Sequence, residues 1–185
     1  MLFRSNEAAF EAHNLMAQML RRDQAALQSF AAFTRSHPQE LAASFGALNA
    51  QAAVLNRWID LIAAKRGVHG SAAAPAWHRA AQSARVPRRI AEFGPLTFQN
   101  DDVLLDRLGP ERVGKIKLLN ADSSRLLNAQ DSGAIYAYEI VNFVDGQRTV
   151  GGIRDAVAGE FGPIPLDVVS DYLQACEEAK IIAFR

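Results

Sequence analysis

Hydrophobic residues recur at helical spacing over the first third of the chain. From Asn6 to about Thr34 the sequence is rich in alanine and favours a helix, with larger apolar residues at Phe10, Leu20, Leu27, Phe30 and Phe33. Ser36 and Gln39 then match a capping box, with Pro38 in the first turn of a second helix that extends to about Arg66. Four residues of this helix share one face, at successive spacings of seven, four and three: Leu48, Leu55, Ile59 and Ile62. Residues 1–67 are therefore predicted to form a helical hairpin whose apolar face needs a partner surface.

The helical pattern stops over residues 68–95. Pro75, Pro87 and Pro95, together with two glycines, exclude a long helix there, so this segment is predicted to be a linker or an irregular arm. Its arginine cluster, RVPRR at 85–89, has the composition of a phosphate-binding patch. Because the overall charge is neutral, we expect instead an arm that is solvated or docked against a domain.

Shorter helical patterns fill residues 96–185. Asn100 is placed to cap a helix ending at Gly109, and Pro110 to begin another that reaches Leu119. A helix over 134–144, with Asp131 as its candidate cap, precedes two more, of which the last carries one apolar face: Val168, Val169, Tyr172, Leu173 and Cys176. Residues 179–184 close the pattern as a short β-branched strand. We predict a mainly α fold: an N-terminal helical hairpin, an irregular arm and, over 96–185, a C-terminal winged-helix-like domain with a short terminal strand.

The segment VNFVDGQRTVGGIRDAV, residues 141–157, joins two of these helices. Asp145 and Gly146 supply a tight turn, because glycine accepts a positive φ. Thr149 can cap the following helix, whose apolar residues recur at three, four and four: Val150, Ile153, Val157 and Phe161. We therefore assign structural roles to four residues: Asp145, Gly146, Thr149 and Ile153. We expect Arg148 to be largely solvated. Neither Asp145 nor Arg148 is expected to contact a ligand.

Composition excludes several classes of function. Twenty basic and twenty acidic residues cancel, which argues against a partner such as duplex DNA. The single cysteine, Cys176, excludes an internal disulfide, and no apolar run approaches the length of a membrane span. We therefore predict neither a nucleic-acid nor a membrane partner.

Residues able to carry chemistry are few and scattered. His13, His37, His69 and His78 do not form the paired pattern of a helix-borne zinc site, and we expect exposed loop histidines with no carboxylate beside His69 or His78. Cys176 lies on an apolar helix face and is expected in the core, and Asp101-Asp102 suits a helix N-terminus. We therefore predict no catalytic, cofactor-binding or metal-binding residues in this chain.

The first five residues, MLFRS, can be translated from the end of a common sequencing adapter. This leads us to expect an artefactual start, and hence the C-terminal part of a longer protein.

Residues 134–183 resemble the C-terminal winged-helix region of bacterial zinc aminopeptidases of the aminopeptidase S and glutamate carboxypeptidase II type. The likeness rests on YE-x-x-NFVDG-x-RTV-x-x-IRD, followed here by EFGPI and a closing helix, and on VPRRIAEFGPL at 86–96. It implies a secreted or periplasmic parent enzyme whose zinc ligands and general base lie in a catalytic domain outside this chain. The parent would then be a metallo-aminopeptidase, and this chain its non-catalytic accessory region, with a structural or domain-docking role. Such a region can close one side of a substrate cleft or form a contact in a homodimer.

The same segment is also similar to peptide-recognition modules of the pyrroloquinoline-quinone chaperone D type, which share an LLDG-x-RTV-x-x-I motif and clamp a peptide as an added edge strand. The three-stranded sheet that precedes the helices in those modules is not evident here, because residues 1–67 have a helical pattern. A free-standing peptide- or protein-binding module is the second hypothesis. A winged-helix DNA binder is the third, and it is disfavoured by the acidic residues of the last helix: Asp167, Asp171, Glu177 and Glu178.

Overall fold

The computed structural model describes residues 6–31, 38–68, 78, 84–90, 100–120 and 132–185. The chain divides into two units, Met1–Pro75 and Ala76–Arg185. Its structure is mainly α, as predicted, with one two-stranded sheet among the described residues.

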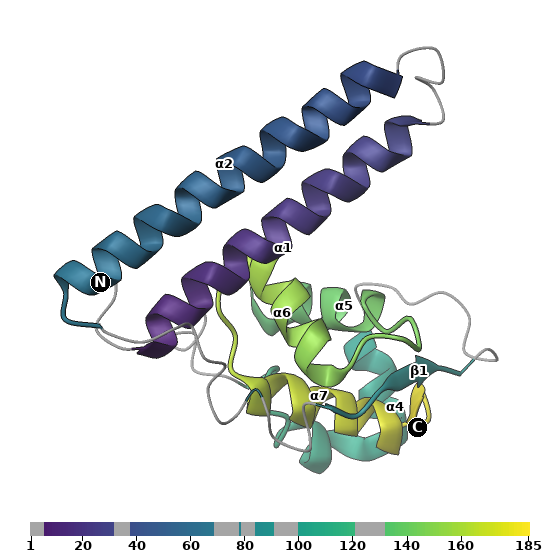
Figure 1. The fold of residues 1–185 in the computed structure, drawn as a ribbon. Coiled ribbons are helices and arrows are strands. Elements are labelled where there is room, and N and C mark those ends of the chain that lie inside the picture. Colours follow the sequence, from purple (N-terminus) through teal and green to yellow (C-terminus); the bar gives the residue numbers. More distant parts are fainter. Residues whose placement is uncertain (1–5, 32–37, 69–77, 79–83, 91–99, 121–131) are drawn as a thin grey trace. The chain divides into compact units, whose positions relative to one another are not determined.

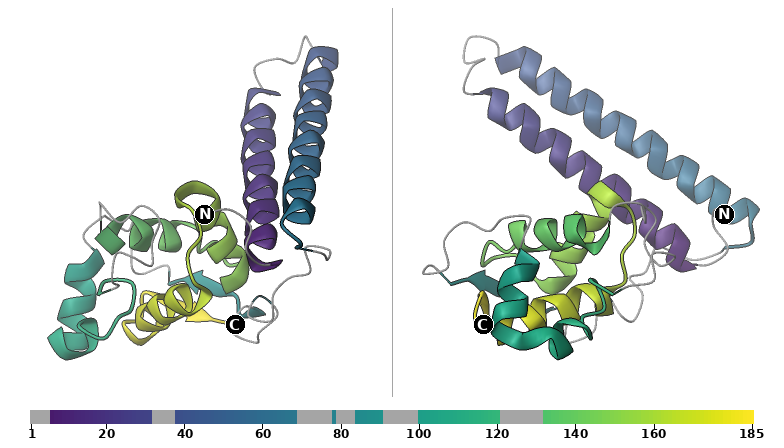
Figure 2. Two further views of the ribbon diagram at one scale, coloured as in Figure 1. Left: turned by 90° about the vertical axis from the view of Figure 1, so that its left-hand side faces the viewer. Right: turned by 180° about the vertical axis from the view of Figure 1, so that it is seen from behind.

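The first unit is an antiparallel helical hairpin of α1 (Asn6–Ala31) and α2 (Pro38–Lys65), which lie side by side along their whole length (Figures 1 and 2). Its fully buried hydrophobic residues, among those described, are all alanines: Ala9, Ala52 and Ala63. Small side chains let two helices approach closely, so the hairpin is close-packed but has little apolar volume at its centre. Polar side chains complete the contact, because His13 lies 2.8 Å from Asn56 and Gln24 donates to Asn49 across 2.9 Å.

The four residues predicted to share one face of α2 differ in exposure. Leu48 and Ile59 are half-buried, but Leu55 and Ile62 are exposed. The alanine-bearing face of α2 packs against α1, and most of the larger apolar residues of α2 lie on its open side. Phe33, Ser36 and His37 lie outside the described residues.

The second unit packs four helices around one core: α4 (Asn100–Val113), α5 (Ser132–Asn142), α6 (Val150–Phe161) and α7 (Leu166–Glu178). The predicted inward faces of α6 and α7 are largely buried. The residues fully excluded from solvent include Ile140 of α5, Ile153 and Val157 of α6, and Val168, Tyr172 and Leu173 of α7. Cys176 is a free thiol in this core. Asp131, predicted to cap α5, lies outside the described residues.

The predicted arm contributes a strand to the second unit. β1 (Pro87–Arg89) pairs antiparallel with β2 (Ile182–Phe184), in a register that sets Pro87 opposite Phe184. Arg85 extends the attachment, because its carbonyl accepts a hydrogen bond of 2.8 Å from the Val150 amide at the start of α6. The segment 85–90, which we predicted to be irregular, is therefore ordered by backbone hydrogen bonds to partners far along the chain.

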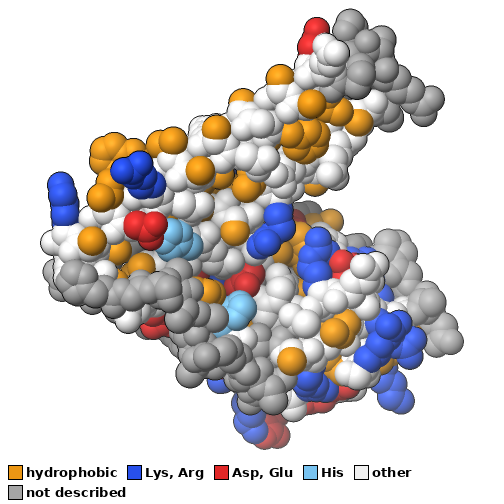
Figure 3. Space-filling view, viewed as in Figure 1, with side chains coloured by type: hydrophobic (Ala, Val, Ile, Leu, Met, Phe, Trp, Pro, Cys, Tyr) orange, Lys and Arg blue, Asp and Glu red, His pale blue; other side chains and the backbone are white. Residues whose placement is uncertain are grey.

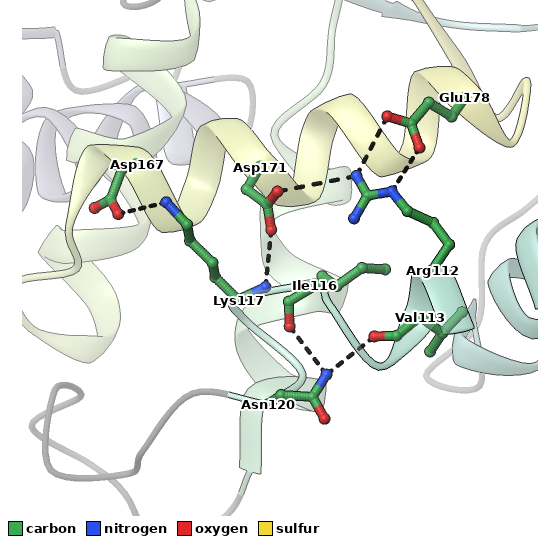
Figure 4. Close-up of polar contacts among 8 residues, drawn as sticks. All are labelled: Arg112, Val113, Ile116, Lys117, Asn120, Asp167, Asp171 and Glu178. Atoms are coloured by element: carbon green, nitrogen blue, oxygen red, sulfur yellow. Dashed lines mark hydrogen bonds and ion pairs between the residues drawn. The ribbon is translucent and has the colours of Figure 1, made fainter. Parts of the chain in front are cut away.

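The helix predicted from Pro110 to Leu119 ends at Val113. Gly109, with φ 76° and ψ 165°, kinks α4 just before Pro110, and a turn replaces the helix after Val113. Ile116 and Leu118, in this turn, are both fully buried. The side-chain amide of Asn120 donates to the carbonyls of Val113 and Ile116 and stabilises the turn (Figure 4).

Candidate functional site

The Asp145–Thr149 segment forms a tight turn between α5 and α6. One carboxylate oxygen of Asp145 accepts hydrogen bonds of 2.8 Å from the backbone amides of Gln147 and Arg148, and the other pairs with the Arg148 guanidinium. Burial opposes ionisation of Asp145, but the hydrogen bonds from Arg148 and Gln147 and the positive charge of Arg148 outweigh it and lower its pKa. The ionised carboxylate of Asp145 thus stabilises the turn through these hydrogen bonds and this ion pair.

Gly146 and Thr149 have distinct structural roles in this turn. Gly146 has φ 76°, a conformation that residues with a side chain rarely adopt. Thr149 is the N-cap of α6, and its hydroxyl oxygen accepts a hydrogen bond of 3.0 Å from the Gly152 amide. Ile153, one residue further, is fully buried. Each of the four residues that we singled out therefore takes part in folding the second unit.

The Arg148 side chain is exposed, and two local contacts fix its orientation. Besides its ion pair with Asp145, its guanidinium carbon lies 5.3 Å from the centre of the Phe143 ring. Both contacts are local to the turn, so they fix the direction of the arginine without burying it.

Arg89 has a role that sequence reasoning missed. Its guanidinium donates to the carbonyls of Val141, Asn142 and Val144, at 2.9–3.1 Å, where α5 ends. The Val141 carbonyl also accepts a hydrogen bond of 3.1 Å from the Val144 amide. Carbonyls at a helix C-terminus lack partners within the helix, and a positive charge there interacts favourably with the helix dipole. Within RVPRR, Arg89 thus fastens β1 to the end of α5.

Two histidines differ from the prediction of exposed loop residues. His13 lies on α1, where its ring nitrogens are 2.8 Å from Asn56 and 2.9 Å from Asp60 of α2. His78 lies 2.9 Å from the Asp155 carboxylate on α6. No carboxylate neighbours His78 in the sequence, but the fold brings it against Asp155, which is 77 positions away. His69 lies outside the described residues.

Asp155 belongs to a small polar cluster within the second unit. Arg154 and Asp155 are both buried, and the Arg154 guanidinium contacts the other oxygen of Asp155 at 3.2 Å. Arg154 also donates to the Ile164 carbonyl across 2.6 Å. A buried charge needs a partner of opposite sign, and the Asp155 carboxylate is that partner for the buried Arg154 guanidinium. The same carboxylate positions His78 against α6.

A zinc site does not fit the described part of the chain. In those ranges no three His, Cys, Asp or Glu side chains come close enough to hold a metal ion. His78 and Asp155 are two potential ligands without a third, whereas protein zinc sites use at least three protein ligands.

The acidic face of α7 is covered by basic residues from α4 and the turn that follows it (Figure 4). Arg112 contacts Glu178 at 2.7 Å and Asp171 at 3.9 Å. Lys117 pairs with Asp167 at 2.9 Å through its ammonium group, and its backbone amide donates to Asp171. The carboxylates of this face therefore serve contacts within the second unit.

Five of the eight large apolar side chains that are exposed among the described residues lie on α2. Val54, Leu55, Trp58, Leu61 and Ile62 fall within nine residues and all remain exposed, with Trp58 at 60%. They lie on one side of the helix at spacings of one, three and four, and we call them the α2 stripe. Figure 3 shows apolar side chains distributed over the surface of the hairpin. Contiguous exposed apolar surface is frequent at protein contact sites.

Among the helices described, none combines the length and hydrophobicity needed to cross a membrane. No protein-family model, no curated protein and no solved structure matches this chain.

Proposed function

We propose that this chain is a non-catalytic accessory region that acts by contact with another protein, and that its parent is a zinc aminopeptidase of the aminopeptidase S and glutamate carboxypeptidase II type. The observation that carries the contact role is the α2 stripe. Trp58, Val54 and Leu61 are 60%, 56% and 48% exposed, on a helix that is already paired with α1 on another side. Tryptophan is enriched among the residues that contribute most to protein–protein binding, and a contiguous exposed apolar surface around it favours a site that another protein covers.

The roles of the motif residues support an accessory rather than a ligand-binding function for the second unit. The segment that carries the resemblance uses Asp145 for a turn, Thr149 for a helix cap and Ile153 for the core. The resemblance thus rests on residues that specify a fold, and a shared fold does not by itself imply a shared activity. Under this proposal the parent's zinc ligands lie in its catalytic domain, and the described residues take no part in holding the metal.

The winged-helix assignment belongs to the same proposal. The helices α5, α6 and α7 are followed by β2, which is the order predicted for this domain. The partner strand of β2 is β1, which comes before the helices in the chain. DNA binding is disfavoured because this face of α7 carries acidic residues, Asp167 and Asp171. The nearby cations, Lys117 and Arg112, pair with these carboxylates and so are not available to neutralise phosphates.

The sequence upstream of codon 1 in the source genome tests this proposal. We expect an open reading frame that continues in phase and encodes paired His, Asp and Glu zinc ligands. The joined protein should hydrolyse aminoacyl-nitroanilides and lose that activity to a chelator, and residues 1–185 alone should not hydrolyse them.

An in-frame stop codon just upstream, or an upstream domain without such ligands, would overturn the peptidase assignment. The α2 stripe would then favour the second hypothesis, a free-standing protein-binding module. Measurable hydrolysis by residues 1–185 alone would overturn the non-catalytic role itself.

A further inference from the structure

We propose that the α2 stripe is covered by the same face of α2 in a second copy of this chain, with the two helices antiparallel. This inference rests on the proposed function, because it names the protein that the accessory region contacts. A contact of this type is isologous, so every residue pair occurs twice across a two-fold axis.

The exposed face of α2 is long enough for such a pairing. It extends from Glu40 to Lys65, where Ala43, Ala47 and Ala50 continue the line of the α2 stripe toward the N-terminus. All of these positions are exposed. At 1.5 Å per residue the face is roughly 38 Å long.

The two halves of this face complement each other in size. The C-terminal half carries the bulky residues of the α2 stripe, and the N-terminal half carries small ones. An antiparallel pairing that sets Trp58 opposite Ala47 also sets Leu55 opposite Ala50, and further along it pairs Leu61 with Ser44 and Ile62 with Ala43. The Ser44 hydroxyl is already bonded to the Glu40 carbonyl at 2.9 Å, so its burial leaves that donor satisfied. Four of the five bulky side chains thus meet a small one, which is how close-packed helix interfaces fill space; the fifth, Val54, lies opposite Gln51 near the two-fold axis.

The ends of the face complement each other in charge. In the same register Glu40, in the first turn of α2, lies opposite Lys65, in its last turn. Both copies contribute such a pair, so opposite charges meet at each end. A parallel pairing would instead bring Glu40 to Glu40 and Lys65 to Lys65, and would set Trp58 against Trp58. Size and charge therefore select the same antiparallel register.

The apolar area is sufficient for a dimer of modest stability. A tryptophan side chain can bury up to about 250 Å², and Trp58 is 60% exposed. The five residues of the α2 stripe together expose on the order of 400 Å² per copy, as large as the largest apolar patch of a typical monomer. Two copies, with the alanines and the end charges added, reach roughly the 1,200 Å² at which stable interfaces begin.

Light scattering coupled to size exclusion tests the pairing on the full chain. We expect a species of about 40 kDa, twice the 20.2 kDa of one chain, that dissociates on dilution. Trp58→Glu should raise the dissociation constant by about a hundredfold, because it places two charges in the apolar centre of the contact. Phe30→Glu is the matched control: Phe30 is 57% exposed but lies on α1, so this variant should dimerise as the parent does. Circular dichroism should show that both variants keep the parent's helix content.

Charge reversal tests the register. Glu40→Lys would face Lys65 of the second copy and should weaken the dimer about three- to tenfold, the range expected for exposed ion pairs that are converted to repulsion. Adding Lys65→Glu should restore the parent's affinity. A parallel dimer would give no such rescue, which would overturn the register.

A monomer at all concentrations, or a dimer that Trp58→Glu leaves intact and Phe30→Glu disrupts, would overturn the pairing. Neither result bears on the reading frame upstream of codon 1, so failure of this inference is distinguishable from failure of the proposed function.

Discussion

Removing the cap of α6 should destabilise the second unit by a defined amount. Thr149→Ala deletes the oxygen that accepts the Gly152 amide at 3.0 Å. The neighbouring Val150 amide keeps its bond to the Arg85 carbonyl, so one donor at the helix N-terminus loses its partner. N-cap deletions cost about 1 kcal/mol, with a range of roughly 0.5–2. For a domain of about 100 residues, a loss of 1 kcal/mol lowers Tm by about 4–8 °C.

Calorimetry of the full chain should show this shift in the transition of the second unit. Hydrogen exchange should show faster exchange at the Gly152 amide in particular. Thr149→Ser is the matched control, because it keeps the hydroxyl oxygen and should retain most of the stability. A Thr149→Ala protein with the parent's Tm, with Gly152 still protected, and with binding to some partner lost would refute the structural interpretation of this segment.

Four further changes test the same unit. Gly146→Val should cost more than the loss of the cap, roughly 1–3 kcal/mol, because a β-branched residue is strained at φ 76°; urea unfolding should show it. Ile153→Asp should unfold the second unit and leave the helical signal of the hairpin, because Ile153 is fully buried and an unpaired charge there costs several kcal/mol; superimposable melts of mutant and parent would contradict its buried position. Arg89→Ala should lower stability by about 1–3 kcal/mol by removing the guanidinium hydrogen bonds at the end of α5, although the Val141 carbonyl keeps its bond to the Val144 amide; Arg89→Lys, which cannot reproduce the fork, should recover only part of this. The pKa of Asp145 is lowered in the folded state from its ordinary 3.8, so the ionised Asp145 stabilises the fold at pH values above 3.8. This stabilisation is lost as the pH falls through the lower pKa of the folded state. Asp145→Asn, which carries no charge, should therefore show a smaller decline of Tm in acid.

Local patterns predicted the helices of the second unit well. The three-and-four spacing of Val150, Ile153 and Val157 placed α6, and the Thr149 cap fixed where it begins. Both signals lie within a few residues of each other, which is why periodicity and capping preferences could identify them.

Contacts between distant residues were not predictable in this way. β1 has three residues, begins with a proline and pairs with a strand almost at the other end of its unit, so nothing local marks it as a strand. The pairing of His78 with Asp155 was missed for the same reason. One local signal was available: Arg154 and Asp155 follow the buried Ile153 directly, so two charges next to a core position implied that each would need a partner.

The residues of α2 that contact α1 were not predicted. The spacing of Leu48, Leu55, Ile59 and Ile62 places them on one face, whereas Ala52 and Ala63 are the residues of α2 that are buried in the hairpin. In an alanine-rich hairpin, close approach of the backbones favours small residues at the contact, and the bulky ones are left for another surface.

The pairing of β1 with β2 has a consequence for synthesis of the chain on the ribosome. Pro87 and its partner Phe184 are 97 positions apart (184 − 87), so the sheet cannot form until nearly all of the second unit has been translated. At roughly 5–20 residues per second, β1 waits for about 5–20 s without its partner strand. An unpaired strand is a site of intermolecular association, and proline and charged residues are the usual protection.

β1 consists of Pro87, Arg88 and Arg89, and so carries that protection in its own sequence. Arg88 and Arg89 are both exposed even after pairing. The composition that predicted an irregular arm therefore suits a strand that has no partner until residue 184 has been translated.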